Sequence, residues 1–137
     1  MADKTQRDVT TPWQAKPGRP EPLRHKRWLY IGIDVGSTSS DLVVLDAAGK
    51  TLLSDYQRTK GRPIEKAHQQ LRRALSQVDP SQVVLAAATG SAGRLLARIL
   101  GIPFVNEVPA QAAAVAYIYP QFRQATIIEM GGQDSKL

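Results

Sequence analysis

The stretch that decides the fold is residues 30–46, YIGIDVGSTSSDLVVLD. An apolar run carries a single acid, Asp34, and breaks at Gly36. Four hydroxyl-bearing residues come next, and a second apolar run follows. Short apolar runs rich in β-branched residues and bounded by glycine are typical of buried strands. The stretch therefore predicts two strands joined by a tight turn, with a carboxylate near the end of the first strand.

Outside this stretch, the spacing of apolar residues alternates between that of strands and that of helices. Pro63 marks a helix start, because the first helical position needs no N–H, and Gly101 marks a helix end. The predicted elements, in chain order, are strands over residues 28–35, 42–45 and 51–58, a helix over 63–78, a strand over 83–88, a helix capped by Ser91 and running to Leu100, a strand over 102–105, a helix over 109–117 and a strand over 125–130.

The order of these elements is βββαβαβα followed by one more strand. Three strands joined by short turns form an antiparallel meander, and the alternation that follows predicts parallel pairing through right-handed crossovers. We therefore expect an α/β fold with a ribonuclease-H-like lobe over residues 28–119, built on a mixed five-stranded sheet. Residues 120–137 are expected to begin a second lobe, of which this chain carries only the first strand.

Composition narrows the class of protein. With 137 residues and 42% hydrophobic content the chain can form a domain with a real core. It has no 18-residue apolar run and no apolar signal at its N-terminus, so we expect no membrane partner and a cytoplasmic protein. The absence of Cys means that the chain supplies no disulfide and no thiolate ligand for a metal or an iron–sulfur cluster.

The positive charge is concentrated at the N-terminus. Residues 1–27 hold seven Lys or Arg against three acids, and so carry four of the six net positive charges. Four prolines and the lack of periodicity predict a disordered basic tail. Such a tail could touch nucleic acid or anionic lipid. We favour a solvated tail without a partner, so nucleic acid is not expected as a ligand.

The polar groups of the opening stretch suit a phosphate. Asp34 lies near the carboxyl end of a central strand, where sheets of this kind bind ligands. Gly36 allows close approach of the backbone, and Ser37, Thr38 and Ser39 offer hydroxyl and N–H donors to phosphate oxygens. A Mg²⁺ ion would offset the cost of burying the carboxylate, and it prefers few carboxylates plus phosphates. This predicts a Mg–nucleotide site; a plain hairpin with a solvated Asp34 is the alternative.

A second stretch, residues 126–137 (TIIEMGGQDSKL), repeats the design of an apolar strand, an acid at its end and a glycine turn. Two such turns suggest two loops that hold one phosphate chain from opposite sides. An unrelated Gly-Gly turn is the weaker alternative. The candidate phosphate-binding residues of this turn are Gly131, Gly132, Gln133, Asp134 and Ser135.

These stretches carry a family resemblance. GIDVGSTSS and IIEMGGQDSK resemble the two phosphate motifs of the actin, hexokinase and heat-shock-chaperone ATPase superfamily, and VNEVPAQAAAVAY (residues 105–117) resembles its connecting helix. Together with ATGSAGR (residues 88–94), the GGQDSK form resembles the BadF/BadG/BcrA/BcrD-type activator ATPases of 2-hydroxyacyl-CoA dehydratases and benzoyl-CoA reductases. The longer activase-like proteins with two such domains look most similar. The resemblance covers residues 28–137.

The resemblance implies an activator that couples ATP hydrolysis to electron transfer from a [4Fe–4S] cluster to a dehydratase or reductase partner. It implies that Asp34 binds Mg²⁺ through water and that Glu107 orients the water or the metal, which makes these two the candidate catalytic residues. Residues 36–39 and 131–135 would hold the phosphates of ATP or ADP from opposite sides. A second ATPase lobe is implied as a further partner, and a homodimer is compatible with the family.

Three features depart from the family pattern. Asp41 stands where many members have Lys, which would weaken the grip on phosphate if the side chain points inward. Ala110 stands at the place of a cluster Cys, so no cluster is expected on this chain. The sequence also stops at the second glycine turn, so we expect the adenosine pocket to be missing, nucleotide binding to be weak and hydrolysis to be slight.

Other functions remain open at this point. A non-catalytic or vestigial nucleotide-binding module is compatible with Asp41 and with the short chain. A ribonuclease-H-like nuclease or resolvase needs several convergent carboxylates, and the strand over residues 83–88 carries none at its end. A sugar kinase of the same superfamily is disfavoured by the GGQDSK form of the second turn.

Overall fold

The computed structural model describes residues 28–122, 124–130 and 135–136. The basic tail and the glycine turn at residues 131–134 lie outside the described residues, so the predictions made for them stay predictions. The strands are β1 (Leu29–Val35), β2 (Ser39–Leu45), β3 (Thr51–Arg58), β4 (Val83–Thr89), β5 (Glu129–Met130) and β6 (Ser135–Lys136). The helices are α1 (Pro63–Gln77), the short 3₁₀ turn η1 (Pro80–Gln82), α2 (Gly93–Leu100) and α3 (Glu107–Ile118).

The main sheet has the strand order β3-β2-β1-β4, with β1, β2 and β3 antiparallel and β4 parallel to β1. This confirms the predicted meander and the predicted parallel crossover. The fifth strand occupies its expected place beside β4, but it is reduced to one bridge between Ala88 and Phe104. The N–H of Ala88 donates to the carbonyl of Pro103 at 2.9 Å, and Val105 N–H donates back to Ala88 at 2.8 Å. Pro103 has no N–H to extend the ladder.

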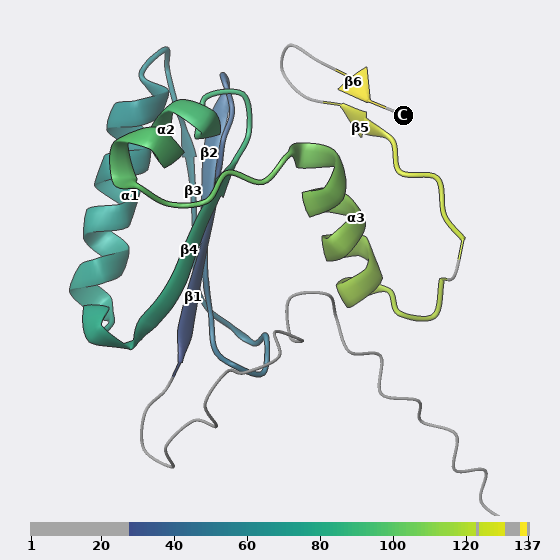
Figure 1. Ribbon diagram of the computed structural model, residues 1–137. Coiled ribbons are helices and arrows are strands. Elements are labelled where there is room, and N and C mark those ends of the chain that lie inside the picture. The colour runs from purple at the N-terminus through teal and green to yellow at the C-terminus, as the bar shows by residue number, and fades with distance from the viewer. Residues whose placement is uncertain (1–27, 123, 131–134, 137) are drawn as a thin grey trace, which may run out of the picture.

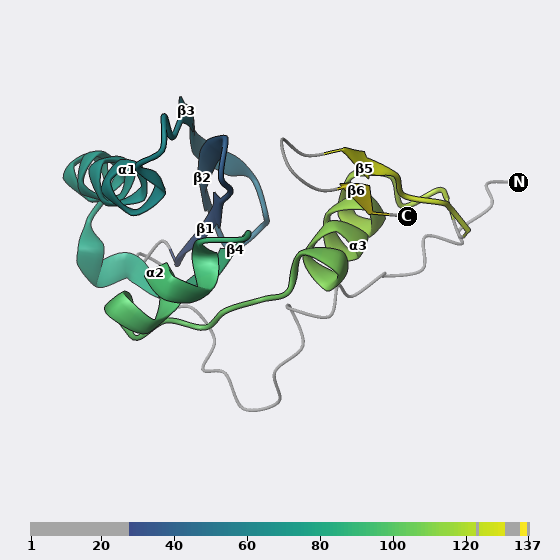
Figure 2. The same cartoon turned by 90° about the horizontal axis from the view of Figure 1, so that it is seen from above.

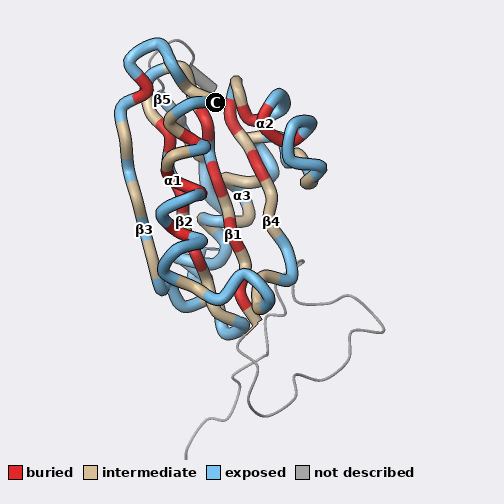
Figure 3. The backbone as a smooth tube through the Cα atoms, turned by 90° about the vertical axis from the view of Figure 1, so that its left-hand side faces the viewer, coloured by how far each residue is buried: buried red, intermediate tan, exposed pale blue. Residues whose placement is uncertain are grey.

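The core lies between the sheet and the helices α1 and α2, which cover the same face (Figures 1 and 2). Strand residues alternate between the two faces of a sheet, and β1 follows this rule with every second residue buried. Figure 3 shows the buried positions running along β1, β2 and the facing side of α1. The buried apolar residues are Leu29, Ile31, Ile33, Val35, Leu42, Val44, Ala67, Leu71, Ala74, Ala88, Leu96 and Ala97.

Gln70 of α1 is a polar member of this core. Its side chain is fully buried, and its Nε2 donates to the carbonyls of Ser40 at 3.0 Å and of Asp55 at 2.7 Å. One residue of α1 therefore ties β2 and β3 together from the helix side.

The helix α3 lies on the opposite side of the sheet from α1 and α2 (Figures 1 and 2). None of its residues is buried. The hydroxyl of Tyr117 donates to the carbonyl of Gly49 at 2.9 Å, in the turn between β2 and β3. In the same turn, Asp46 Oδ1 accepts from the N–H groups of Ala48 and Lys50, both at 2.9 Å. A polar contact therefore ties α3 to the turn between β2 and β3.

Two helix starts differ from their predictions. Ser91 does not cap α2: the N-cap is Ala92, which has no side-chain cap, and its N–H donates to the carbonyl of Val35 at 2.8 Å. The chain is thus fixed to the end of β1 by backbone alone. The helix α3 begins at Glu107, two residues earlier than predicted, because the side chain of Asn106 accepts from the N–H of Val108 at 3.1 Å.

The predicted strand over residues 125–130 forms only at its end. Glu129–Met130 pairs antiparallel with Ser135–Lys136, and the resulting hairpin lies beside α3 (Figures 1 and 2). The predicted boundary between two lobes at residue 120 stays a prediction. Within the described part of the chain, no helix combines the length and apolar character needed to cross a membrane.

Candidate functional site

Asp34 is exposed near the carboxyl end of β1, on the sheet face opposite α1 and α2. It pairs across the sheet with Asp41 of β2 and with Thr89 of β4. The burial pattern of β1 explains the direction of its side chain, since Ile33 and Val35 on either side of it point into the core. The predicted place of this residue at the end of a central strand agrees with the structure. The predicted burial of its carboxylate is wrong, because every second side chain of β1 faces away from the core and Asp34 is one of these, so the cost of burial gives no argument for Mg²⁺ here.

The turn after β1 is held by a residue from the end of β3. Gly36 N–H donates to Ser39 O at 2.9 Å and closes the turn. Thr59, which is fully buried, donates from its backbone N–H to Thr38 O at 2.9 Å and from its hydroxyl to Ser37 O. Both carbonyls of the turn are therefore engaged with Thr59, on one side of the turn.

The backbone N–H groups of Ser37 and Thr38, unlike the carbonyls of the same residues, have no hydrogen-bond partner among the described residues. A turn whose carbonyls are engaged and whose amides are free is an anion-binding arrangement, because only donors remain to meet a ligand. Thr38 is exposed and Ser37 is half-buried, so a ligand can reach both.

Gly90 packs closely against the carboxylate of Asp34. It is buried, has a φ of 91°, and follows directly on β4. A Cβ added at this position would collide with Asp34 Oδ1 and would lie 2.6 Å from the carbonyl oxygen of Val35. Only glycine fits, so Gly90 fixes how closely the chain after β4 approaches the end of β1.

Asp41 points to the same sheet face as Asp34, because the two are direct cross-strand partners. Sequence alternation alone left this direction open. Burial raises the pKa of Asp41 above its ordinary value of 3.8, a hydrogen bond from Ser39 lowers it, and the charge of Asp55 raises it further. Asp41 therefore places a carboxyl, and no cation, beside the turn.

Asp41 should give the protein a pH-dependent loss of stability. A carboxyl with a raised native pKa binds its proton more tightly when folded, so its contribution is present below pH 3.8 and is lost as pH rises through the native pKa. We expect Asp41→Asn to melt at a slightly higher temperature than the unmodified protein at pH 7, with the difference shrinking toward pH 4. Thermal melts of both proteins across this range measure it; a difference independent of pH would contradict the expectation.

Glu107 is the first residue of α3 and is half-buried. The register places it near the site: the bridge at Phe104 aligns with Ala88, and Thr89, the next residue of β4, pairs with Asp34. The chain therefore leaves the fifth-strand position at the same end of the sheet as the turn after β1 (Figure 1). Whether Glu107 orients water or metal stays a prediction.

The second predicted turn is not placed. Gly131, Gly132, Gln133 and Asp134 lie outside the described residues, and for Ser135 only its place in the backbone of β6 is described. The prediction that the two glycine turns hold one phosphate chain from opposite sides therefore stays a prediction.

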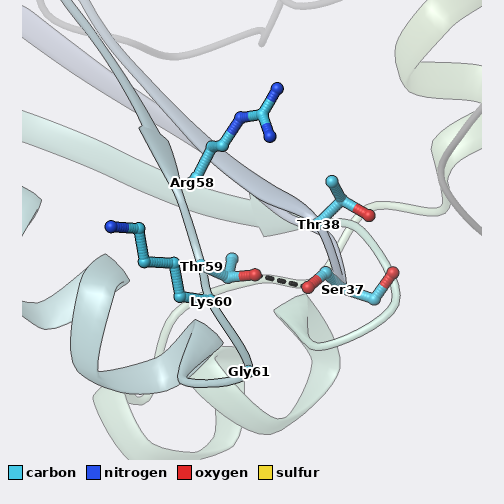
Figure 4. Close-up of a pocket in the computed structure, with 6 residues that line it drawn as sticks. All are labelled: Ser37, Thr38, Arg58, Thr59, Lys60 and Gly61. Atoms are coloured by element: carbon cyan, nitrogen blue, oxygen red, sulfur yellow. Dashed lines mark hydrogen bonds between the residues drawn. The ribbon is translucent and has the colours of Figure 1, made fainter.

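The structure also shows residues that sequence reasoning missed. An open hollow of about 200 Å³ lies between the turn after β1 and the loop that joins β3 to α1. Figure 4 shows its lining: Ser37, Thr38, Arg58, Thr59, Lys60 and Gly61. The sequence signal was the polar run RTKG before Pro63, which ends a strand with two cations and a glycine. Nothing in that run indicates that it packs against a turn some 20 residues earlier, as the hydrogen bond from Thr59 to Ser37 shows.

Comparison with known proteins yields no match to a family model and none to a curated protein. Solved structures are similar. Component A of (R)-2-hydroxyglutaryl-CoA dehydratase from Acidaminococcus fermentans aligns with a TM-score of 0.68 at 22% identity, over 79% of this chain and 41% of that one. The activator of 2-hydroxyisocaproyl-CoA dehydratase from Clostridium difficile, which carries bound ADPNP, aligns with a TM-score of 0.58 at 24% identity, over 80% and 39%. A Ppx/GppA phosphatase from Aquifex aeolicus aligns with a TM-score of 0.50 at 20% identity, over 79% and 46%.

These likenesses show the fold. The chain has part of the actin-like ATPase fold, which confirms the fold class expected from the order of the predicted strands and helices. It spans about two-fifths of the length of the two dehydratase activator components.

Proposed function

We propose that this chain is an ATP-binding lobe of an activator ATPase, one that couples ATP hydrolysis to electron transfer toward a CoA-ester dehydratase or reductase. The observation that carries the proposal is the turn after β1. Its carbonyls are engaged by Thr59, its amides at Ser37 and Thr38 donate to no acceptor among the described residues, and Asp34 lies beside it at the strand end. The similarity of the fold to a dehydratase activator with bound ADPNP supports the same conclusion.

The donor set near the turn suits Mg²⁺. Among the described residues no three His, Asp or Glu side chains are grouped to hold a metal, so Asp34 would act with few protein ligands. Mg²⁺ keeps several waters and binds through one or two carboxylates together with substrate phosphates. When bound, it would neutralise phosphate charge. Asp34 would hold it, and the turn amides would hold the phosphate oxygens and orient them by donating hydrogen bonds.

The electron-transfer part of the proposal needs partners. The chain has no Cys and supplies no cluster thiolate, so the [4Fe–4S] cluster of such an activator would be held elsewhere. A second ATPase lobe would supply the adenosine contacts.

The alternative function of a nuclease has little support from the acidic residues of the structure. Two-metal cutting needs several convergent carboxylates, and the described residues show no such group.

Nucleotide binding is expected to raise the melting temperature of the 137-residue protein. A ligand that binds only the folded state at 100 times its Kd stabilises that state by about 2.7 kcal/mol. Because the adenosine pocket is expected to be missing, we expect a smaller stabilisation than this from millimolar ATP with Mg²⁺, a still smaller one without Mg²⁺, and a further reduction in Asp34→Asn. Thermal melts with ATP, ADP and adenosine, each with and without Mg²⁺, measure it. No shift from ATP or ADP, with adenosine as the reference, would contradict the proposal.

The proposed activator role is tested by measuring how the protein binds its partner enzyme. Binding of the protein to a CoA-ester dehydratase or reductase component should differ between ATP and ADP, because such an activator changes its contacts with nucleotide state. Equal binding in the two nucleotides, in a co-sedimentation experiment, would leave the ATP-binding lobe supported and the activator role rejected.

A further inference from the structure

The turn after β1 has a charge problem that the sequence alone does not reveal. Asp34 and Asp41 are cross-strand partners on the sheet face opposite α1 and α2, beside the turn. Even with Mg²⁺ held at Asp34, a polyphosphate approaching that face would meet the carboxylate of Asp41 and only neutral donors from the turn itself. Like charges repel at this range, and neutral hydrogen bonds are weaker than charged ones. A cation near the turn would restore the balance.

Arg58 is a cation that lies beside the turn after β1. It is the direct cross-strand partner of Ser39, the last residue of the turn, so it lies on the same sheet face as Ser39 and Asp41. It is exposed and lines the hollow that Ser37 and Thr38 also line. Figure 4 shows its guanidinium and Thr38 on the same side of β3, whereas the ammonium of Lys60 extends on the other side.

Two other arginines near the site are engaged in ion pairs, and Lys60, which also lines the hollow, extends on the other side of β3 (Figure 4). Arg62 pairs with Glu65 at 3.5 Å, and Arg73 pairs with Asp55 at 2.6 Å. Within the described residues Arg58 forms no ion pair. Its position is fixed by the backbone around it, because the next residue, Thr59, is fully buried and bonded to the turn on both its N–H and its hydroxyl.

We propose that Arg58 is a phosphate-binding residue, and that the hollow between the turn and the loop after β3 receives a phosphoryl group held jointly by Arg58 and the free amides of Ser37 and Thr38. A guanidinium donates two parallel N–H bonds to phosphate oxygens, a geometry that an ammonium cannot match. Its charge offsets that of Asp41. This inference rests on the proposed function, since it assigns a further residue to the same phosphate turn.

The test uses inorganic tripolyphosphate and ATP, titrated by calorimetry into the full chain and into three variants. Arg58→Gln should bind both anions about ten-fold more weakly, the loss expected for one charge-assisted contact. Arg58→Lys should recover part of the affinity, because it keeps the charge and loses the paired geometry. Arg62→Gln is the matched control: it removes the same charge four residues away, from a side chain that is 67% exposed and paired with Glu65, and it should bind like the unmodified protein.

The outcomes separate this inference from the proposed function. If ATP and tripolyphosphate bind equally well to the unmodified protein and to Arg58→Gln, the inference is overturned and the ATP-binding proposal stands. If tripolyphosphate binds in an Arg58-dependent way and ATP does not bind, the anion site stands and the ATP-binding proposal falls. If Arg62→Gln weakens binding as much as Arg58→Gln, the effect is one of net charge and the inference is overturned. If neither anion binds, both fall.

Discussion

Replacing Gly90 with Ala is expected to destabilise the protein more than any other single substitution considered. The position has a φ of 91°, and an alanine Cβ would collide with Asp34 Oδ1 and lie 2.6 Å from Val35 O. Backbone strain of this kind costs about 1–3 kcal/mol, and overpacking costs about 1–3 kcal/mol more. We expect the free energy of unfolding to fall by about 2–6 kcal/mol, as measured by urea denaturation.

The Ala variant should also lose nucleotide-dependent stabilisation, because its Cβ displaces the carboxylate that we assign to Mg²⁺. Gly101→Ala is the matched control. Gly101 has a positive φ of 65° at the end of α2, and nothing lies within 4 Å of a Cβ placed there. That variant bears the strain without the collision and should lose about 1 kcal/mol. Equal losses in the two variants would show that the contact with Asp34 and Val35 does not matter.

Replacing Gln70 with Ala is expected to have the next largest effect. The side chain is fully buried, and its Nε2 donates to the carbonyls of Ser40 and Asp55. Alanine leaves both acceptors without this donor and opens a cavity beneath β2 and β3. An unmet buried acceptor costs about 1–3 kcal/mol, so we expect a loss of about 2–5 kcal/mol in the free energy of unfolding once the cavity is included.

Gln69→Ala provides the comparison on the same helix. Gln69 is half-buried. Its Nε2 donates to Glu65 at 3.1 Å and its Oε1 accepts from Lys66 at 3.2 Å, both within α1. Its loss should change stability by no more than about 0.5 kcal/mol. Gln70→Leu fills the cavity and still lacks the donor, so it should recover only part of the loss. A Gln70→Ala variant as stable as Gln69→Ala would show that this tie between α1 and the sheet contributes nothing.

The strand and helix assignments were largely predictable because their signals are local. The third strand and the start of α1 agree with prediction to the residue, and the order of elements from β1 to α2 is as expected. The predictions were less accurate for elements whose bounds depend on hydrogen bonds to a distant part of the chain. The strand expected over residues 102–105 is one bridge, since Pro103 cannot donate. The helix start assigned to Ser91 was wrong, because Ala92 bonds to the end of β1 instead.

For the site, local sequence is enough to predict the glycine turn, its hydroxyl residues and the position of Asp34 near a strand end, because all of these follow from neighbours along the chain. The other relations arise only in the folded protein. The tertiary structure sets Asp41 opposite Asp34, Gly90 against the carboxylate, Thr59 under the turn and Arg58 across from Ser39. These relations depend on strand register, which shifts a side chain from one face to the other with a slip of a single residue. Register is fixed by the packing of the whole sheet against α1 and α2, and no short stretch of sequence carries it.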